Sequence, residues 1–223
     1  MNEKKTVFQA EEYLDLLVKG QISARDGNIT VQGEVIINGH DEQFKSLTTI
    51  ELCSATFTDL VLISNFERFE IKQQFTCSLT LSSSNFLGGL LVEKIGEGDI
   101  GRFITIHGCT AKWVKFVKCE VGTITVKDLT VDDSLNISGI HASDGINLDG
   151  VICHGLNLIS DVDRKFISAS IVRTDDPIIA LQFHFAGIPV FMSSKAIKKM
   201  RDDARPLGER IVPVMDGHPS SSE

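Results

Sequence analysis

Apolar residues recur about every five positions between Ile50 and Leu158. In each unit, two apolar or small residues flank one residue that we expect to face solvent. Examples are the pairs Ile50/Leu52, Leu60/Leu62, Leu79/Leu81, Ile104/Ile106 and Ile124/Val126. An α-helix would repeat its apolar positions about every 3.6 residues, and a hairpin needs strands longer than one such unit. Short strands separated by tight corners fit the spacing, so the pattern predicts a β-solenoid.

The repeat also predicts the dimensions of the solenoid. Four units make a coil of ~20 residues, and the repeat region holds enough units for about five or six coils. At the ~4.8 Å spacing of neighbouring strands, these coils would form a rod on the order of 25 Å long. Gly139, Gly145, Gly150 and Gly155 each come just before an inward pair, where a tight corner often needs a positive φ.

Several units share a small residue, an Asn or Asp, and a central Leu or Phe. They include Ala55-Thr56-Phe57, Ser64-Asn65-Phe66, Ser84-Asn85-Phe86, Asn136-Ile137-Ser138-Gly139, Asn147-Leu148-Asp149-Gly150 and Asn157-Leu158. Over residues 47–160 the chain therefore resembles a degenerate pentapeptide-repeat protein. The resemblance implies a single-stranded, right-handed parallel β-helix and no particular activity, because such repeats serve many tasks. Phase slips near Phe75, Leu135 and Ile146 leave open another right-handed β-helix or a bactofilin-like solenoid.

The N-terminal region, residues 1–46, is expected to close one end of the repeat region, residues 47–161. Apolar residues at helical spacing predict a short amphipathic helix over 7–18. Alternating apolar residues predict β structure over 21–39, which we interpret as a capping coil. A cap is needed because a bare terminal coil would expose both the apolar interior and an unpaired strand edge.

The C-terminal region, residues 162–223, is expected to cap the other end. Its predicted elements are a strand at 166–172, a β-hairpin at 178–192 that turns at Ala186-Gly187, a helix from Ser193 or Ser194 to about Arg205, and a frayed tail at 218–223. The predicted fold is therefore mainly β, a single-stranded right-handed parallel β-helix with a short N-terminal helix and a C-terminal hairpin and helix. The candidate interface residues, on one face of that hairpin and one stripe of that helix, are Ile179, Leu181, Phe183, Phe185, Ile197 and Met200.

Composition and charge narrow the class of protein. With 42% apolar and 23% charged residues and a net charge of −8, the chain is not expected to be disordered or to bind nucleic acid directly. Five cysteines are too few for a disulfide scaffold, and the odd number favours a reducing compartment. Acidic residues interrupt the N-terminal apolar stretch, and the apolar run from Ile178 to Met192 is too short to span a bilayer. We therefore expect a cytoplasmic protein with no membrane partner.

Cysteines and histidines give no pattern typical of a metal or redox site. Cys77, Cys109, Cys119 and Cys153 fall on inward positions, whereas Cys53 falls on an outward one. The sequence has no Cys-x-x-Cys motif and no histidine pair at helical i, i+4 spacing. The glycines at 96–101 lie in an acidic loop that lacks the following Lys-Ser or Lys-Thr of a phosphate-binding loop. We expect neither a metal ion nor an organic cofactor.

Acidic residues gather late in the repeat, where residues 120–161 contain seven acids and one base. The candidate binding residues on this acidic face are Asp128, Asp132, Asp133, Asp144 and Asp149. Such a face could steer a basic partner. Because some pentapeptide-repeat proteins are acidic rods that imitate DNA, the resemblance makes a DNA mimic that binds a DNA-handling enzyme one alternative function. A small polysaccharide-active enzyme is another, because solenoid glycosidases and lyases also gather carboxylates on one face.

The first interpretation of the sequence is a non-catalytic protein. The long regular core, the distinctive ends and the lack of an assembled catalytic motif favour a rigid scaffold for protein interaction or assembly. Its protein partner is not identified by the sequence. A second copy of the chain, bound through the C-terminal region, is one candidate.

Overall fold

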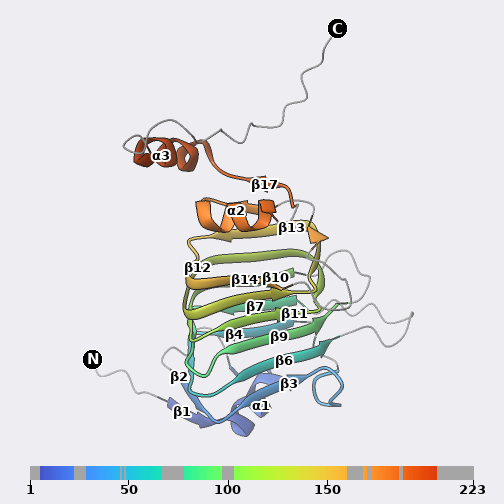
Figure 1. The fold of residues 1–223 in the computed structure, drawn as a ribbon. Coiled ribbons are helices and arrows are strands. Elements are labelled where there is room, and N and C mark those ends of the chain that lie inside the picture. Colours follow the sequence, from blue (N-terminus) through green and yellow to red (C-terminus); the bar gives the residue numbers. More distant parts are fainter. Residues whose placement is uncertain are drawn as a thin grey trace.

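The structure is a computed structural model. It describes residues 6–22, 29–45, 47, 49–66, 78–96, 103–159, 168–169, 172–185 and 188–204. Within these ranges the chain forms a parallel β-solenoid of about five turns (Figure 1). The expected solenoid is therefore confirmed.

One parallel sheet winds through the whole solenoid. Its strands are β1 (Thr6–Gln9), β2 (Ile29–Gln32), β3 (Val35–Asn38), β4 (Thr49–Cys53), β5 (Ala55–Phe57), β6 (Val61–Phe66), β7 (Ser78–Ser82), β8 (Asn85–Phe86), β9 (Leu90–Ile95), β10 (Phe103–Ala111), β11 (Val114–Val117), β12 (Glu120–Ser138), β13 (His141–Asp149), β14 (Ile152–Ile159), β15 (Ser168–Ala169), β16 (Val172–Thr174) and β17 (Val190–Phe191). Each of these strands hydrogen-bonds in parallel to a strand of the neighbouring turn.

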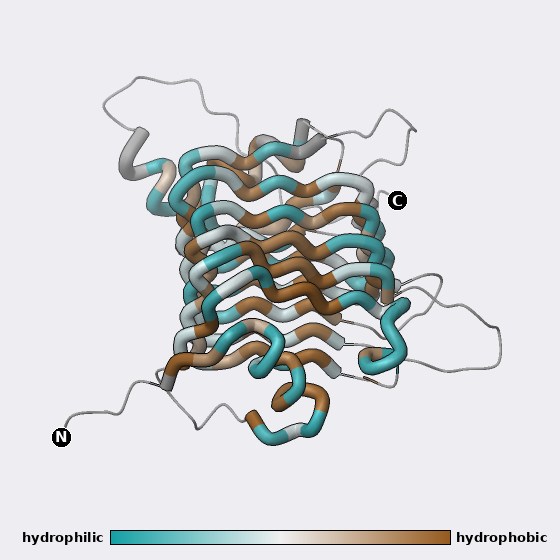
Figure 2. Tube along the Cα trace, turned by 90° about the horizontal axis from the view of Figure 1, so that it is seen from below, coloured by the Kyte–Doolittle hydropathy of each residue, from teal (hydrophilic) through white to brown (hydrophobic). Residues whose placement is uncertain are grey.

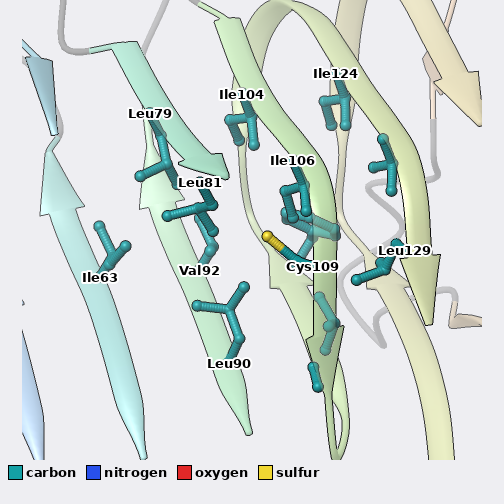
Figure 3. Close-up of a cluster of buried hydrophobic side chains, with 14 of the residues drawn as sticks. Ile63, Leu79, Leu81, Leu90, Val92, Ile104, Ile106, Cys109, Ile124 and Leu129 are labelled. Atoms are coloured by element: carbon teal, nitrogen blue, oxygen red, sulfur yellow. The ribbon is translucent and has the colours of Figure 1, made fainter. Parts of the chain in front are cut away.

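The turn from β10 to β12 has the predicted size. Ile104 pairs with Ile124, which lies 20 residues later. Between these two residues the chain passes four inward pairs, all of them buried. The pairs are Ile104/Ile106, Cys109/Ala111, Val114/Phe116 and Cys119/Val121. Figure 3 shows how such residues from neighbouring strands point into one continuous apolar core.

The corners of the coils stack as regularly as the strands. One corner places Ser54, Ser83, Gly108, Asp128 and Gly150 one above another, and all five have φ between 50° and 62°. The left-handed conformation bends the chain sharply from one face of the solenoid to the next. In Figure 2, hydrophilic colour lies at many of these corners and apolar colour lies along the strands.

Among the units that the structure describes, the predicted inward phase is wrong at one. Leu60 and Leu62 are only partly buried, whereas Val61 and Ile63 are fully buried. The reason is the corner between β5 and β6, in which Thr58 to Leu60 add one residue to the regular spacing. A one-residue shift turns every side chain of a strand to the opposite face. Leu62 therefore points outward.

The N-terminal cap begins later than predicted. The segment expected to start the helix forms strand β1, which pairs with β2, and helix α1 covers only Ala10–Val18. Tyr13 of α1 is fully buried, and its ring meets that of Phe57 edge-on at a centroid distance of 5.5 Å. Phe57 in turn stacks on Phe86 at 5.3 Å. Helix α1 therefore closes the solenoid by inserting an aromatic ring above an aromatic stack.

Replacing Tyr13 with phenylalanine is expected to stabilise the fold. The Tyr13 hydroxyl is buried without a hydrogen-bond partner, and burial raises the pKa of this phenol. Removing an unpaired buried hydroxyl should increase the free energy of unfolding by about 1 kcal/mol. Urea denaturation of both proteins measures the difference. Tyr13→Leu is the control, since loss of the ring should destabilise, and a less stable Tyr13→Phe variant would contradict the prediction.

The C-terminal cap is a helix where a β-hairpin was predicted. Residues Pro177–Phe185 form helix α2. Asp176 caps this helix, because its Oδ1 accepts hydrogen bonds from the backbone N–H groups of Ile178 and Ile179 at 2.8 and 3.0 Å. Proline is favoured at the first position of a helix. The Asp-Pro pair was the sequence signal that the hairpin prediction overlooked.

The helix changes which of the predicted interface residues share a face. Ile179 and Phe183 are buried against the core, whereas Leu181 is exposed. The side chain of Phe185 lies outside the described residues. Alternate residues share a face in a strand, but residues three or four apart do so in a helix. The expected common face of the four residues is therefore wrong.

Helix α3 covers Ser194–Ala204, close to the predicted range. The Ser193 hydroxyl accepts the Ala196 N–H at 3.2 Å, which confirms a serine N-cap. Ser193 is also tied to the loop after β16, since its N–H and hydroxyl donate to the Asp175 carboxylate at 2.9 and 2.7 Å. Ile197 and Met200 are partly buried.

Candidate interaction surfaces

The five candidate aspartates are all exposed, but they lie at different corners of the solenoid. Asp128 and Asp149 lie at the corner described above, and Asp132 and Asp133 lie at the next corner along the chain. Asp144 precedes β13 residue Gly145 at a third corner. The structure therefore spreads the predicted acidic face around the rod.

Basic side chains also interrupt the acidic residues at the first of these corners. His107 Nε2 lies 3.5 Å from Asp128 Oδ2, and more than half of each side chain is exposed. Lys127 lies in register between His107 on one turn and Asp149 on the next. Exposed pairs of this kind contribute little to stability. The positive charge of Lys127 interrupts the negative field that an acidic stripe would need.

A C-terminal apolar patch lies on the outer side of α2 and on β17. We define it as Ile178, Leu181 and Phe191, whose exposed fractions are 67%, 49% and 52%. Ile178 and Leu181 are three residues apart and share one face of α2. The other face of α2 is already buried on the core through Ile179 and Phe183. The outer face is therefore not needed to close the solenoid.

A second apolar surface, which the sequence analysis missed, covers the N-terminal part of one side of the rod. We call it the side face and define it as Ile36, Leu60, Leu62, Leu91 and Trp113, on or beside strands β3, β6, β9 and β11. These strands lie one above another in Figure 1. Ile36 pairs with Leu62, and Leu62 pairs with Leu91, so three aliphatic side chains form an outward ladder. Uninterrupted apolar runs at 35–37, 60–63 and 90–92 were the signal for it.

Trp113 lies beside the ladder, in the neighbouring column of outward positions, and its ring is held in a fixed position. A side chain on Gly89 would come within 2.2 Å of Trp113 Cε2, so the indole lies against the bare glycine backbone of the turn below. The Lys115 ammonium lies over the indole, 5.0 Å from the ring centroid. Such cation–π contact holds a charge over an aromatic ring. The lysine is thereby held beside Trp113.

The opposite end of the side face carries acids. Glu34, just before β3, is exposed. The Asp59 carboxylate accepts hydrogen bonds from the Thr58 hydroxyl at 2.7 Å and the Gly33 N–H at 2.9 Å. These two bonds, the one from Thr58 first, lower the pKa of Asp59. Asp59 is therefore ionised at neutral pH.

The cysteines lie mostly where the repeat places them. Cys109 and Cys119 are buried, Cys153 is partly exposed, and Cys77 lies outside the described residues. Cys53 lies in register with Ser82 and His107 in the outward column, as predicted, but it is buried, and the Ser82 hydroxyl donates to its Sγ at 3.0 Å. In the part of the chain that the structure describes, no group of three or more His, Cys, Asp or Glu side chains could hold a metal ion.

The described cysteines should differ strongly in reactivity. Burial raises the pKa of the Cys119 thiol to about 12, and it also raises the pKa of the less buried Cys153. Because the thiolate must be both formed and reachable, N-ethylmaleimide should modify Cys153 at least about tenfold faster than Cys119 at neutral pH. Mass spectrometry of peptides after timed quenching measures both rates. The difference should vanish in denaturant, and equal rates in the native protein would contradict the prediction.

No family model, no curated protein and no solved structure matches this chain. Among the helices that the structure describes, none is both long and apolar enough to cross a membrane.

Proposed function

We propose that this protein is a non-catalytic β-solenoid that serves as a rigid scaffold for protein interaction or assembly. The observation that carries the proposal is the C-terminal apolar patch. Ile178 and Leu181 remain exposed although the inner face of α2 already covers the end of the core. Exposed apolar clusters of this kind mark protein contact sites more often than scattered single residues do.

The interior supports a rigid role. Ladder hydrogen bonds join each turn to the next, and the inward residues of all turns form one continuous apolar cluster from Ala10 to Ile188. Close-packed interiors resist deformation, so a partner at one end would keep a fixed distance from a partner on the side.

We also propose that the repeat is a degenerate member of the pentapeptide-repeat type. Four strand segments per turn and two inward residues per segment support this proposal, as the turn from Ile104 to Ile124 illustrates. The free thiols of Cys53, Cys109, Cys119 and Cys153 support a reducing compartment such as the cytoplasm.

The placement of the acidic residues favours neither alternative function. A DNA mimic needs a continuous acidic stripe, and a glycosidase needs two facing carboxylates. The five aspartates lie at three corners, and Lys127 lies in register beside Asp149. We therefore retain the scaffold as the single proposal.

The test compares the wild type with the double variant Ile178→Ser/Leu181→Ser. The tagged proteins would be used in pull-downs from the native host, and mass photometry would give the mass of the complexes. We expect a defined complex with the wild type and its loss with the variant. Lys195→Ser/Lys198→Ser, on the exposed side of α3, is the control for surface substitution and should keep the complex.

Thermal melting must show that the double variant stays folded, which is expected because both side chains are exposed. A wild type that binds nothing, or a complex that the double variant retains in full, would overturn the proposed role of this patch.

A further inference from the structure

We infer that the side face is a contact between two copies of this chain, which pack face to face with their rods antiparallel. The inference deepens the proposed assembly role and rests on it, but it uses a different surface from the C-terminal apolar patch. The distribution of apolar and charged residues along this face fits a second copy of the chain as the partner.

The side face differs from the other faces of the solenoid in its outward residues. On the face formed by β4, β7 and β10, the central outward positions in successive turns are Glu51, Thr80 and Thr105. On the face formed by β5 and β8, they are Thr56 and Asn85. Polar outward residues are typical of a solvated sheet, whereas an aliphatic ladder is typical of a sheet covered by another layer. Ile36 of the ladder is nevertheless 42% exposed.

The geometry of the ladder allows the face to pair with itself. Consider a second copy turned by 180° about an axis that runs along the strands and passes between β6 and β9. This rotation places β9 opposite β6 and β11 opposite β3. Leu91 of each copy then faces Leu62 of the other, so the contact is the same on both sides of the axis. Two sheets that pack through such side chains lie about 10 Å apart.

The same rotation matches the charges at the two ends of the face. Glu34 precedes β3 by one residue and Trp113 precedes β11 by one residue, so the rotation places Glu34 opposite Trp113. The register places Lys115 itself opposite Ile36 of the other copy, but its ammonium leans over Trp113 and is therefore directed toward Glu34 of that copy. Symmetry forms this pair twice. A parallel arrangement of the rods would instead oppose like charges.

The size of the face sets the expected strength. The four turns span about 14 Å along the rod at the ~4.8 Å strand spacing, which is small for a specific interface. We therefore expect a dimer that dissociates on dilution, with a dissociation constant on the order of micromolar.

The experiment is sedimentation velocity of the full chain over a concentration series. We expect the wild type to shift from monomer to dimer as the concentration rises. Leu91→Lys should weaken the dimer at least about tenfold, because it buries two unpaired charges near the axis. The same column already holds Lys115 one turn later, so the fold should accept the change. Thr80→Lys, at the equivalent outward position on another face, is the matched control and should leave the dimer unchanged.

A charge exchange tests the antiparallel arrangement. Glu34→Lys and Lys115→Glu should each weaken the dimer, because each leaves like charges opposite each other. The double variant Glu34→Lys/Lys115→Glu should restore it. No rescue would overturn the antiparallel arrangement, and a merely unfolded variant would be recognised by its circular dichroism.

The outcomes separate this inference from the proposed C-terminal role. A wild type that stays monomeric at every concentration, or a dimer that Leu91→Lys leaves intact, would overturn the inference. If Ile178→Ser/Leu181→Ser abolishes the dimer and Leu91→Lys does not, self-association belongs to the C-terminal patch. If only the side-face variants abolish it, the inference stands without support from that patch.

Discussion

Replacing Phe57 with alanine is expected to lower the free energy of unfolding by about 3–5 kcal/mol. Phe57 is fully buried and joins the Tyr13 ring of the cap to the Phe86 ring of the next turn. Its loss removes apolar surface from the core and leaves a cavity that stacked turns cannot close. This loss is a large part of the stability of an ordinary domain. Chemical denaturation of the variant and the wild type measures it.

The neighbouring residue provides the control for this experiment. Thr56 belongs to the same strand but points to the opposite side and is only partly buried. Thr56→Ala should change the free energy of unfolding by less than about 1 kcal/mol, because it removes only a partly solvated hydrogen bond from Asn85. Equal effects of the two substitutions would contradict the assignment of inward and outward positions.

Replacing Gly88 with alanine is expected to destabilise the fold by about 3 kcal/mol. A Cβ atom at this position would lie 2.2 Å from the carbonyl carbon of Asp59 in the turn below. That contact is with backbone, and the hydrogen bond from the Leu87 N–H to the Phe57 carbonyl, 2.9 Å long, fixes the distance between the turns. The added methyl group must push two turns apart. Thermal and urea denaturation measure the cost.

Gly155 offers a matched control at the same corner, two turns beyond Trp113. A Cβ atom there would lie 3.8 Å from Ser134 Cβ, which is ordinary contact. Gly155→Ala should be neutral or slightly stabilising, because alanine restricts the unfolded chain. A Gly155→Ala variant as unstable as Gly88→Ala would show that steric contact between turns is not the cause.

The repeat was predictable because one side of each solenoid strand faces the apolar core and the other side faces solvent. The pairs Leu79/Leu81 and Ile124/Val126 are buried where the spacing placed them. The prediction failed at Leu60 and Leu62, because the length of the preceding corner decides which residues of the next strand face inward. In a fully apolar run, the alternation of apolar and polar residues cannot distinguish the two possibilities. For the same reason the side face was not predicted, since an outward leucine next to an inward valine has the apolar character of a core residue.

The corner residues were also predicted only in part. Gly139, Gly145 and Gly150 have positive φ, as expected, whereas Gly155 does not. Ser54 and Asp128 adopt the same left-handed conformation without being glycine. Stacking against the turns above and below holds these residues in the left-handed conformation. Contacts between turns are not visible in the local sequence.

The sequence by itself determined the solenoid, the length of its turns and the identity of most core residues. Those features follow from local alternation of apolar and polar residues, which every turn repeats. The tertiary structure decided that the five aspartates lie at separate corners and that Ile36, Leu62 and Leu91 form one ladder. Both features depend on which residues pair between successive turns, 20 to 29 positions apart between β2 and β14, and insertions between turns set that register.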